Sequence, residues 1–287
     1  NVIDNFSPDI AAISVLFSNL LESAHNIAKI IKRVKKNTTV ILGGNHISSA
    51  VTDYNISKMT PDSGLPDTIN DLENSYFDFA MTGEGEFSSL ELTNKIMNNE
   101  DISKIPGLVK KIENKKYLIN APSRVHNLNL LPRPARHLVD MEAYFKIGAF
   151  HSAKSRSKRV LSVMCSRGCP EKCTFCSTPE MWGNNTRWRS TEHIMDEIGN
   201  DVKDFKIGEI QFDDDTITVN KKNLYSLCNE LEKIGLPWCT PNGTKVNYHL
   251  RKQDEMYKTM ADSGCYQITL ACESGVQRVL DDIINKR

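Results

Sequence analysis

Short apolar runs alternate with longer amphipathic stretches along the first hundred residues. A continuous apolar run at 9–17 is typical of a strand buried on both faces of a parallel sheet, and shorter runs at 38–42 and 77–81 predict two further strands. Apolar residues repeat at helical spacing after the first run and again over 87–97. The stripe of the first predicted helix consists of Leu20, Ala24, Ile27, Ile31 and Val34. This alternation predicts an α/β unit with right-handed crossovers and a doubly wound sheet.

The middle of the chain lacks a sustained repeat. Residues 50–76 are rich in Ser, Asp, Asn and Pro, which predicts a loop with at most a short helix. From about 100 to 153 the pattern is irregular, apart from apolar runs at 105–109 and 116–119 that predict a small hairpin. The Pro-rich run 131–136 predicts a rigid connection between two domains.

Regular alternation of strands and helices returns after residue 155. Four apolar runs predict strands at 159–164, 206–212, 237–240 and 265–272. Ser190 and Asn220 are suited to begin the helices after the first two strands, and Gly235 is suited to end the second helix. In this layout, α/β proteins place functional residues at the carboxyl ends of the strands.

Length and charge restrict the class of protein. With 287 residues the chain is long enough for two domains, each with its own core. Thirty-six basic and 36 acidic residues cancel, so nothing indicates a nucleic-acid partner. The basic run 154–159 is interpreted as a solvated linker, and no apolar run approaches the length of a membrane span. Because the chain begins at Asn1 and ends inside a predicted helix, we expect an internal fragment.

Eight cysteines are present, and four of them fall within residues 165–176. Such clustering in a large chain without a signal peptide argues against a disulfide framework. Reduced thiols and a cytoplasmic location are therefore expected. Cys165 is interpreted as a small buried residue at the end of a strand.

Cys169, Cys173 and Cys176 stand at the spacing C-x3-C-x2-C, which puts three thiolates on one tight loop. A structural zinc site usually has four ligands in C-x2-C pairs, and the sequence has no second pair. A cubane iron–sulfur cluster takes four ligands, so three cysteines would leave one iron open for a small molecule. A zinc knuckle and a ferredoxin-type loop remain the alternatives at this point.

Segments on both sides of this loop resemble the radical S-adenosylmethionine (SAM) enzymes, and among them the cobalamin-binding branch. These segments are Cys165-Ser166-Arg167-Gly168, Met181-Trp182-Gly183 and Arg187-Trp188-Arg189-Ser190. The resemblance implies that the three cysteines of the loop hold a [4Fe–4S] cluster. It implies that the fourth iron chelates the amino and carboxylate groups of SAM, and that Phe175 lies near the adenine.

Carboxylates follow two of the predicted strands. The strand at 206–212 ends in three aspartates, for which a solvated turn is the alternative interpretation. Their Phe-x-Asp-Asp pattern resembles a family motif that accepts hydrogen bonds from the SAM amino group, a role that the resemblance gives to Asp214 and Asp215. Glu273 and Ser274 resemble the Glu-Ser-Gly element of the family, which implies contacts with the ribose and methionine end of SAM.

Three elements in the first hundred residues resemble the cobalamin-binding branch. They are a Ser-x-Leu, a Gly-Gly and a Gly-Glu element, which contain Ser14, Leu16, Gly43, Gly44, Gly83 and Glu84. In the cobalamin-binding fold the first two accept the nucleotide tail, because small residues leave room for a bulky heterocycle. His46 is an alternative cobalt ligand, although a hydrogen-bonded histidine in a polar loop is the favoured interpretation. A flavodoxin-like sheet that serves only as a scaffold is the alternative for this unit.

The resemblance implies both organisation and function. Residues 1–100 form a flavodoxin-like, doubly wound cobalamin-binding domain truncated at its N-terminus. Residues 101–155 form an irregular linker, and 156–287 form a partial (β/α) radical SAM barrel truncated at its C-terminus.

The implied function is a radical SAM enzyme that cleaves SAM reductively to a 5′-deoxyadenosyl radical, with cobalamin as methyl carrier to an unactivated carbon. The expected partners are a small-molecule or natural-product substrate and an external flavodoxin- or ferredoxin-like electron donor. A cobalamin-dependent cyclase or rearrangement enzyme, and a cobalamin or Fe–S sensor without turnover, are the alternatives.

Overall fold

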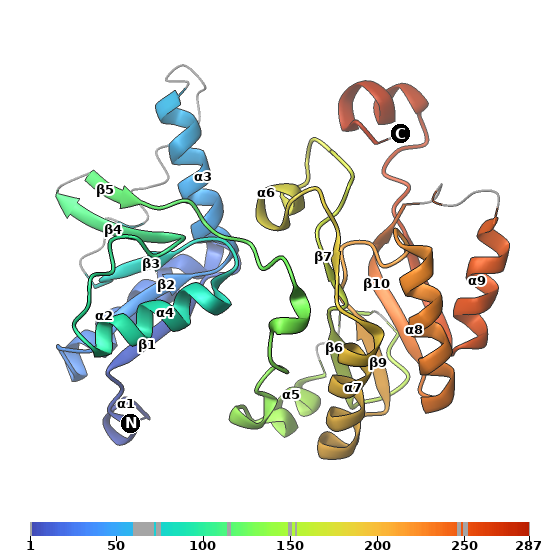
Figure 1. The fold of residues 1–287 in the computed structure, drawn as a ribbon, viewed down its shortest axis with the longest axis horizontal. Helices are drawn as coiled ribbons and strands as arrows, with labels where there is room; N and C mark the ends of the chain where they lie inside the picture. Colours follow the sequence, from blue (N-terminus) through green and yellow to red (C-terminus); the bar gives the residue numbers. More distant parts are fainter. Residues whose placement is uncertain are drawn as a thin grey trace. The chain divides into compact units, whose positions relative to one another are not determined.

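The computed structural model describes residues 2–59, 72, 76–113, 116–148, 151–152, 154–245, 248 and 252–286. The chain divides into two compact units, residues 1–125 and residues 126–287. In Figure 1 the first unit runs from blue to green and the second from green to red. Each unit has its own β-sheet and its own buried core.

Unit 1 is built on a five-stranded sheet in the order β1-β2-β3-β4-β5. The strands are β1 (Ile10–Ser14), β2 (Thr39–Gly43), β3 (Phe79–Met81), β4 (Leu108–Glu113) and β5 (Lys116–Ile119). The first three strands are parallel, whereas β4 and β5 form an antiparallel hairpin on β3. Ser14 pairs with Gly43 in the register of β1 and β2, so these two residues end neighbouring strands at one edge of the sheet.

Helices cover both faces of this sheet. They are α1 (Val2–Phe6), α2 (Leu21–Val34), α3 (Asn45–Met59) and α4 (Gly85–Met97), with a short 3-10 turn at Ser18–Leu20. Helices α2 and α3 pack against the face that contains Leu42, and α4 packs against the opposite face, which contains Ile41. Neighbouring residues of a strand point to opposite faces, so the unbroken apolar run of β2 supplies both cores.

Several sequence predictions for unit 1 need correction. Helix α3 occupies 45–59, where a loop was expected; the rest of the predicted 50–76 loop lies mostly outside the described residues. On α2 the buried residues are Ala24, Ala28 and Ile31, whereas Ile27 is half exposed, because the stripe follows the i, i+4, i+7 spacing. Strand β1 is not buried on both faces, since it pairs only with β2 in the described part of the sheet.

The predicted hairpin is present as β4 and β5, although its turn lies outside the described residues. Because this hairpin continues the sheet, unit 1 reaches residue 125 rather than residue 100. The strand order β1-β2-β3 is sequential, so the reversal that defines a doubly wound sheet does not occur within the described residues.

Unit 2 is built on a parallel four-stranded sheet in the order β11-β10-β9-β6. Its strands are β6 (Val160–Val163), β9 (Glu209–Phe212), β10 (Trp238–Thr244) and β11 (Cys265–Leu270). The connecting helices are α7 (Thr191–Phe205), α8 (Lys221–Ile234) and α9 (Gln253–Asp262). All four predicted strands are therefore present, and they form part of a (β/α) barrel.

Helix ends in unit 2 match the sequence prediction. The side chains of Ser190 and Asn220 accept hydrogen bonds from backbone N–H groups of the first turns of α7 and α8. Gly235 ends α8 in the left-handed conformation. The core between sheet and helices contains Phe212 and Trp238, whose rings meet edge to face at 5.3 Å.

Smaller elements complete unit 2. They are the 3-10 turns Leu128–Leu130 and Arg136–Leu138, α5 (Met141–Ile147), β7 (Ser166–Arg167), α6 (Thr178–Trp182), β8 (Arg187–Trp188) and a π-helical segment at Val279–Ile284. Part of the run 154–159 is not a solvated linker, because Arg159 pairs with Glu142 and donates to a backbone carbonyl, and Arg156 lies on the Tyr266 ring. Within the described residues, no helix combines the length and apolar character needed to cross a bilayer.

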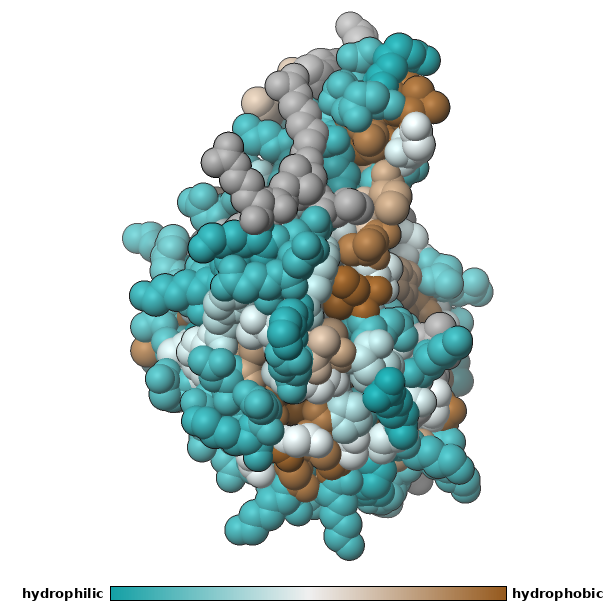
Figure 2. All heavy atoms as spheres, turned by 90° about the vertical axis from the view of Figure 1, so that its right-hand side faces the viewer, coloured by the Kyte–Doolittle hydropathy of each residue, from teal (hydrophilic) through white to brown (hydrophobic). Residues whose placement is uncertain are grey.

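Polar side chains cover most of the face of unit 2 in Figure 2, and apolar side chains gather between them in the upper half of the view. Exposed apolar residues on β11 and the segment after it are Leu270, Val276 and Ile283. Strand β11 is the edge of the described sheet, so its apolar residues are only partly covered.

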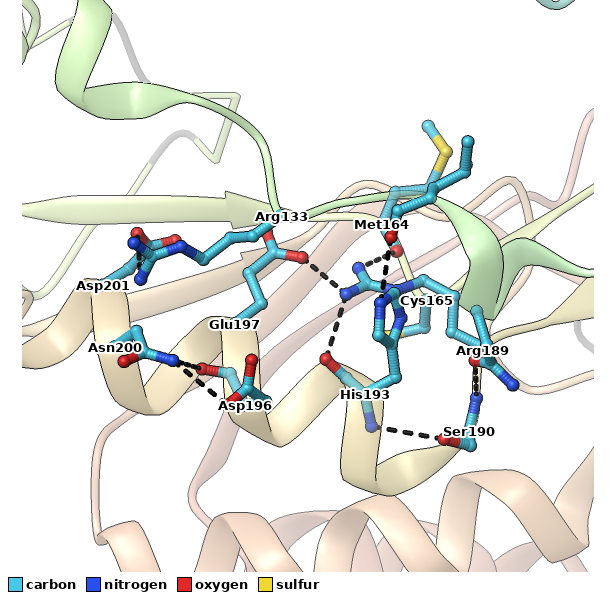
Figure 3. Close-up of polar contacts among 12 residues, drawn as sticks. Arg133, Met164, Cys165, Arg189, Ser190, His193, Asp196, Glu197, Asn200 and Asp201 are labelled. Atoms are coloured by element: carbon cyan, nitrogen blue, oxygen red, sulfur yellow. Dashed lines mark hydrogen bonds and ion pairs between the residues drawn. The ribbon is translucent and has the colours of Figure 1, made fainter. Parts of the chain in front are cut away.

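A buried ion-pair network ties α7 to the residues that follow β6, and Figure 3 shows its contacts of Arg189 with Glu197 and of Arg133 with Asp201. Glu197 and Asp201 are almost fully buried, and the Arg136 guanidinium lies 2.8 and 2.6 Å from their carboxylates. Arg189 pairs with Glu197 at 2.6 Å and donates to the carbonyl of Met164 at 3.0 Å. The residues after β6 are thus tied to α7 by charge-assisted bonds that solvent screens little.

We expect Arg136→Met to lower the free energy of unfolding by about 3 kcal/mol, because it leaves Asp201 with only a distant partner. That partner, Arg133, lies 3.8 Å away and is more exposed. Arg133→Met is the matched control, with an expected loss below about 1 kcal/mol. Urea unfolding of both variants measures this, and equal losses would contradict the assignment.

Candidate active site at the carboxyl ends of the barrel strands

The cysteine loop begins at the carboxyl end of β6. After the buried Cys165, the short strand β7 pairs with β8, and the chain turns at Gly168 with a φ of +99°. A Cβ atom at Gly168 would lie 2.6 Å from the carbonyl oxygen of Asn185. Only glycine fits this position, for its conformation and for its close approach to the neighbouring segment.

The three cysteines of the predicted cluster line one cavity of about 200 Å³. Cys169, Cys173 and Cys176 are all half-buried. The same cavity is lined by residues that follow β9 and β11, among them Asp215 and Glu273. The structure therefore brings one loop and two strand ends to a common space, as the sequence predicted.

The cysteine thiols are partly buried and lie near carboxylates. Burial, with smaller contributions from the carboxylates of Asp215 and Glu171, raises the pKa of Cys169 to about 11. Burial likewise raises the pKa of Cys173. These thiols would become thiolates when a cationic metal centre displaces their protons.

The donor set suits a cluster better than a single ion. In the described part of the chain, no three His, Cys, Asp or Glu side chains converge as ligands of one metal ion. A cubane needs wider spacing because each thiolate binds a different iron. Each carboxylate that lines the cavity already has a partner: Lys245 for Glu171, Thr178 for Asp215 and Lys286 for Glu273. The three cysteines are the residues that would hold a cluster at this cavity.

The residues predicted to contact SAM fall into two groups. Phe175, Asp215 and Glu273 line the cavity, and the Phe175 side chain is largely exposed. Asp214 and Ser274 do not line it. Ser274 instead accepts a hydrogen bond from the backbone N–H of Val276 at 3.1 Å.

Asp214 has a structural position at the base of the cysteine loop. It is fully buried, and its carboxylate accepts hydrogen bonds from the backbone N–H groups of Cys165 and Ser166, at 3.0 and 2.5 Å. The Ser166 hydroxyl donates a third bond at 2.5 Å. Burial raises the pKa of Asp214 to about 6, although these hydrogen bonds oppose the shift. Two consecutive aspartates of one motif therefore face different surroundings.

Sequence reasoning missed the cations and the C-terminal segment of the site. Lys245, Tyr248 and Lys286 all line the cavity, but nothing in their local sequence indicates it. The segment after β11 returns to the cysteine loop, where Thr174 donates from its N–H to the carbonyl of Ile284 and from its hydroxyl to that of Ile283. The predicted C-terminal helix ends at Asn285, which is left-handed with a φ of +55°.

The residues predicted for cobalamin lie in unit 1 at the carboxyl ends of its parallel strands. Ser14 and Leu16 are exposed at the end of β1, next to Gly43. Gly44 has a φ of +100°, and a Cβ atom there would lie 2.6 Å from the carbonyl oxygen of Val15, so the fold itself requires this glycine. At Gly43 the nearest atom would be 3.7 Å away, which leaves room for a side chain or for a ligand.

The remaining residues of that group are engaged within unit 1. A Cβ atom at Gly83 would lie 2.5 Å from the Pro122 side chain, and Glu84 is buried and accepts a hydrogen bond from the N–H of Val125. His46 lies in the first turn of α3 rather than in a polar loop, and its Nδ1 is 3.0 Å from the hydroxyl of Ser18.

Comparison with known proteins agrees with this arrangement. The family model for the radical SAM superfamily matches residues 163–287, from the end of β6 to the last residue. Residues 163–287 form a radical SAM domain. The chain is 31% identical to cytidylyl-2-hydroxyethylphosphonate methyltransferase of Streptomyces wedmorensis, over 99% of the chain and 54% of that protein.

Two other proteins are similar to this chain. Identity is 24% to the cobalamin-dependent radical SAM methyltransferase TokK of Streptomyces tokunonensis, over 97% of this chain and 38% of TokK. The radical SAM methyltransferase TsrM of Kitasatospora setae, solved with cobalamin and a [4Fe-4S] cluster, has a TM-score of 0.70 at 15% identity and shares the fold. That match covers 95% of this chain and 50% of TsrM. The chain spans about half of the length of the first curated relatives that it matches.

We expect Asp214→Asn to lower the free energy of unfolding by about 2 kcal/mol, because an amide cannot accept all the hydrogen bonds that the buried carboxylate accepts. Asp215→Asn is the matched control, with an expected change below about 1 kcal/mol, since its side chain lines the cavity. Urea unfolding of the protein without metal measures both variants. A larger loss for Asp215→Asn than for Asp214→Asn would contradict these roles.

Proposed function

We propose that this protein is a cobalamin-dependent radical SAM methyltransferase. The observation that carries the proposal is the cavity in which three cysteines of one loop face Asp215 and Glu273 from two strand ends. In the proposed reaction a cluster at these cysteines would supply one electron that cleaves SAM to methionine and a 5′-deoxyadenosyl radical. This radical would take a hydrogen atom from an unactivated substrate carbon, to which cobalamin would supply the methyl group.

The protein's own residues bind and orient the reactants. Cys169, Cys173 and Cys176 hold the cluster. Asp215 accepts a hydrogen bond from the ammonium group of SAM, and Glu273 contacts the ribose and methionine end. Phe175 offers an exposed ring next to the cysteines, on which the adenine can stack.

Cobalamin is assigned to the strand ends of unit 1. A Cβ atom at Gly43 would meet no atom closer than 3.7 Å, and the exposed Ser14 lies beside Gly43 in the register of the sheet. Leu16 and Phe17 add exposed apolar surface after β1, which is suited to a large heterocycle. The relative TokK is named a cobalamin-dependent enzyme, and 97% of the residues of this chain match it.

Domain limits, partners and location complete the proposal. Unit 1 would be the cobalamin-binding domain, and unit 2 the radical SAM domain, joined through the segment around residues 126–140. The substrate would be a small molecule, and the electron would come from a flavodoxin- or ferredoxin-like donor. A reducing cytoplasm suits the eight free cysteines.

We expect Cys176→Ala to abolish the brown absorbance of protein reconstituted anaerobically with iron and sulfide, because a cluster ligand is lost. Cys272→Ala is the control, since Cys272 is exposed and does not line the cavity. The wild type, once reduced, should convert SAM to 5′-deoxyadenosine. An intact cluster without SAM cleavage would favour a sensor over an enzyme.

We expect Gly43→Val to weaken binding of hydroxocobalamin by at least about tenfold, because its side chain fills the space assigned to the corrinoid. Its thermal stability should stay near that of the wild type, since a Cβ atom at this position meets no atom closer than 3.7 Å. Absorbance titration with hydroxocobalamin measures binding. Unchanged affinity would remove Gly43 from the site, and no binding by the wild type would remove cobalamin from the proposal.

A further inference from the structure

A carboxylate within the cysteine loop is paired with a cation from a different strand end. Glu171 stands between the first two cysteines of the loop, and the ammonium group of Lys245 lies 3.0 Å from each of its two carboxylate oxygens. Lys245 follows β10. The hydroxyl of Tyr248 donates a further hydrogen bond to Glu171 at 2.7 Å.

This pair is more shielded from water than an ordinary surface pair. The side chain of Glu171 is 20% exposed and that of Lys245 is 15% exposed. Both residues line the same cavity as the cysteines. Charges in such surroundings act on a neighbouring charge with less screening than charges in open solvent.

Contacts other than this pair also hold the loop. Thr174 is held by the two carbonyls of the C-terminal segment, and the N–H of Cys176 donates to the carbonyl of Cys173 at 3.1 Å. The amide of Asn285 also donates to the carbonyl of Lys172. An electrostatic role for the pair can therefore be separated from a role in folding the loop.

We propose that Lys245 offsets the charge of Glu171, so that this carboxylate does not lower the reduction potential of a cluster bound by the cysteine loop. The inference rests on the proposed function, because it requires a cluster at the three cysteines. Reduction adds one negative charge to the cluster, so a nearby cation favours the reduced form and a nearby anion disfavours it. Paired as they are, the two charges nearly cancel, and the removal of either one leaves the other unbalanced.

Two single variants should shift the potential in opposite directions. In Glu171→Gln the charge of Lys245 is unbalanced while the shape of the side chain is kept, so the potential should become more positive. In Lys245→Met the charge of Glu171 is unbalanced, so the potential should become more negative. At the midpoint potential of the wild type, the ratio of reduced to oxidised cluster should change about tenfold in each case, which is about 59 mV for one electron.

The measurement is an anaerobic redox titration of the reconstituted full chain, with the electron paramagnetic resonance signal of the reduced cluster as the readout. The double variant Glu171→Gln with Lys245→Met should return close to the wild-type potential. Lys245→Arg should also stay close to it, since it keeps the charge. Lys258→Met removes the same charge from an exposed pair on α9 and should leave the potential unchanged.

Shifts of the two single variants in the same direction, or shifts no larger than that of Lys258→Met, would overturn the inference. A double variant displaced as far as the single variants would also overturn it. If the wild type forms no cluster, the proposed function itself fails. Unchanged potentials on an intact cluster leave the proposed function standing and remove only the role of this pair.

Discussion

One buried carboxylate, that of Asp214, holds the cysteine loop to the sheet. Asp214 is the second residue after β9, and its carboxylate accepts hydrogen bonds from the backbone of the residues that follow β6. Without it, two buried N–H groups would lack an acceptor. The cysteines converge because a neighbouring strand fixes the start of their loop.

The fold also decides which charged residues meet in the cavity. Two of the carboxylates in the cavity are neutralised by lysines that come from distant segments, Glu171 by Lys245 and Glu273 by Lys286. Asp215 accepts a hydrogen bond from Thr178 and is not in an ion pair with a described cation. The cavity thus keeps a negative balance near the cysteines, which suits a ligand that carries sulfonium and ammonium groups.

Local sequence signals predicted the elements of the barrel well. The strands appear as short runs rich in apolar residues. The side chains of Ser190 and Asn220 cap helices because each is a small acceptor placed before an amphipathic stretch. The same signals predicted a loop for most of α3, because that helix contains many polar residues. They also placed Ile27 in the apolar stripe of α2, although its side chain is half exposed. Tertiary contacts decided both cases.

The site was predictable where one motif supplies the chemistry and not where distant segments meet. The spacing of the cysteines and the position of Asp215 and Glu273 at strand ends were sufficient to bring them together. No local pattern indicates that Asp214 is buried whereas Asp215 lines the cavity, because this difference depends on which side of the chain each residue faces. Lys245 and Lys286 reach the cavity only through the fold, and so sequence alone could not identify them.

The most direct measurement is electron–nuclear double resonance on the reduced, reconstituted protein with SAM labelled at its amino nitrogen and carboxylate oxygen. If three cysteines hold the cluster and the fourth iron is open, both labels will show hyperfine coupling to the cluster. A cluster without such coupling, or zinc in place of iron at the three cysteines, would contradict this account of the site.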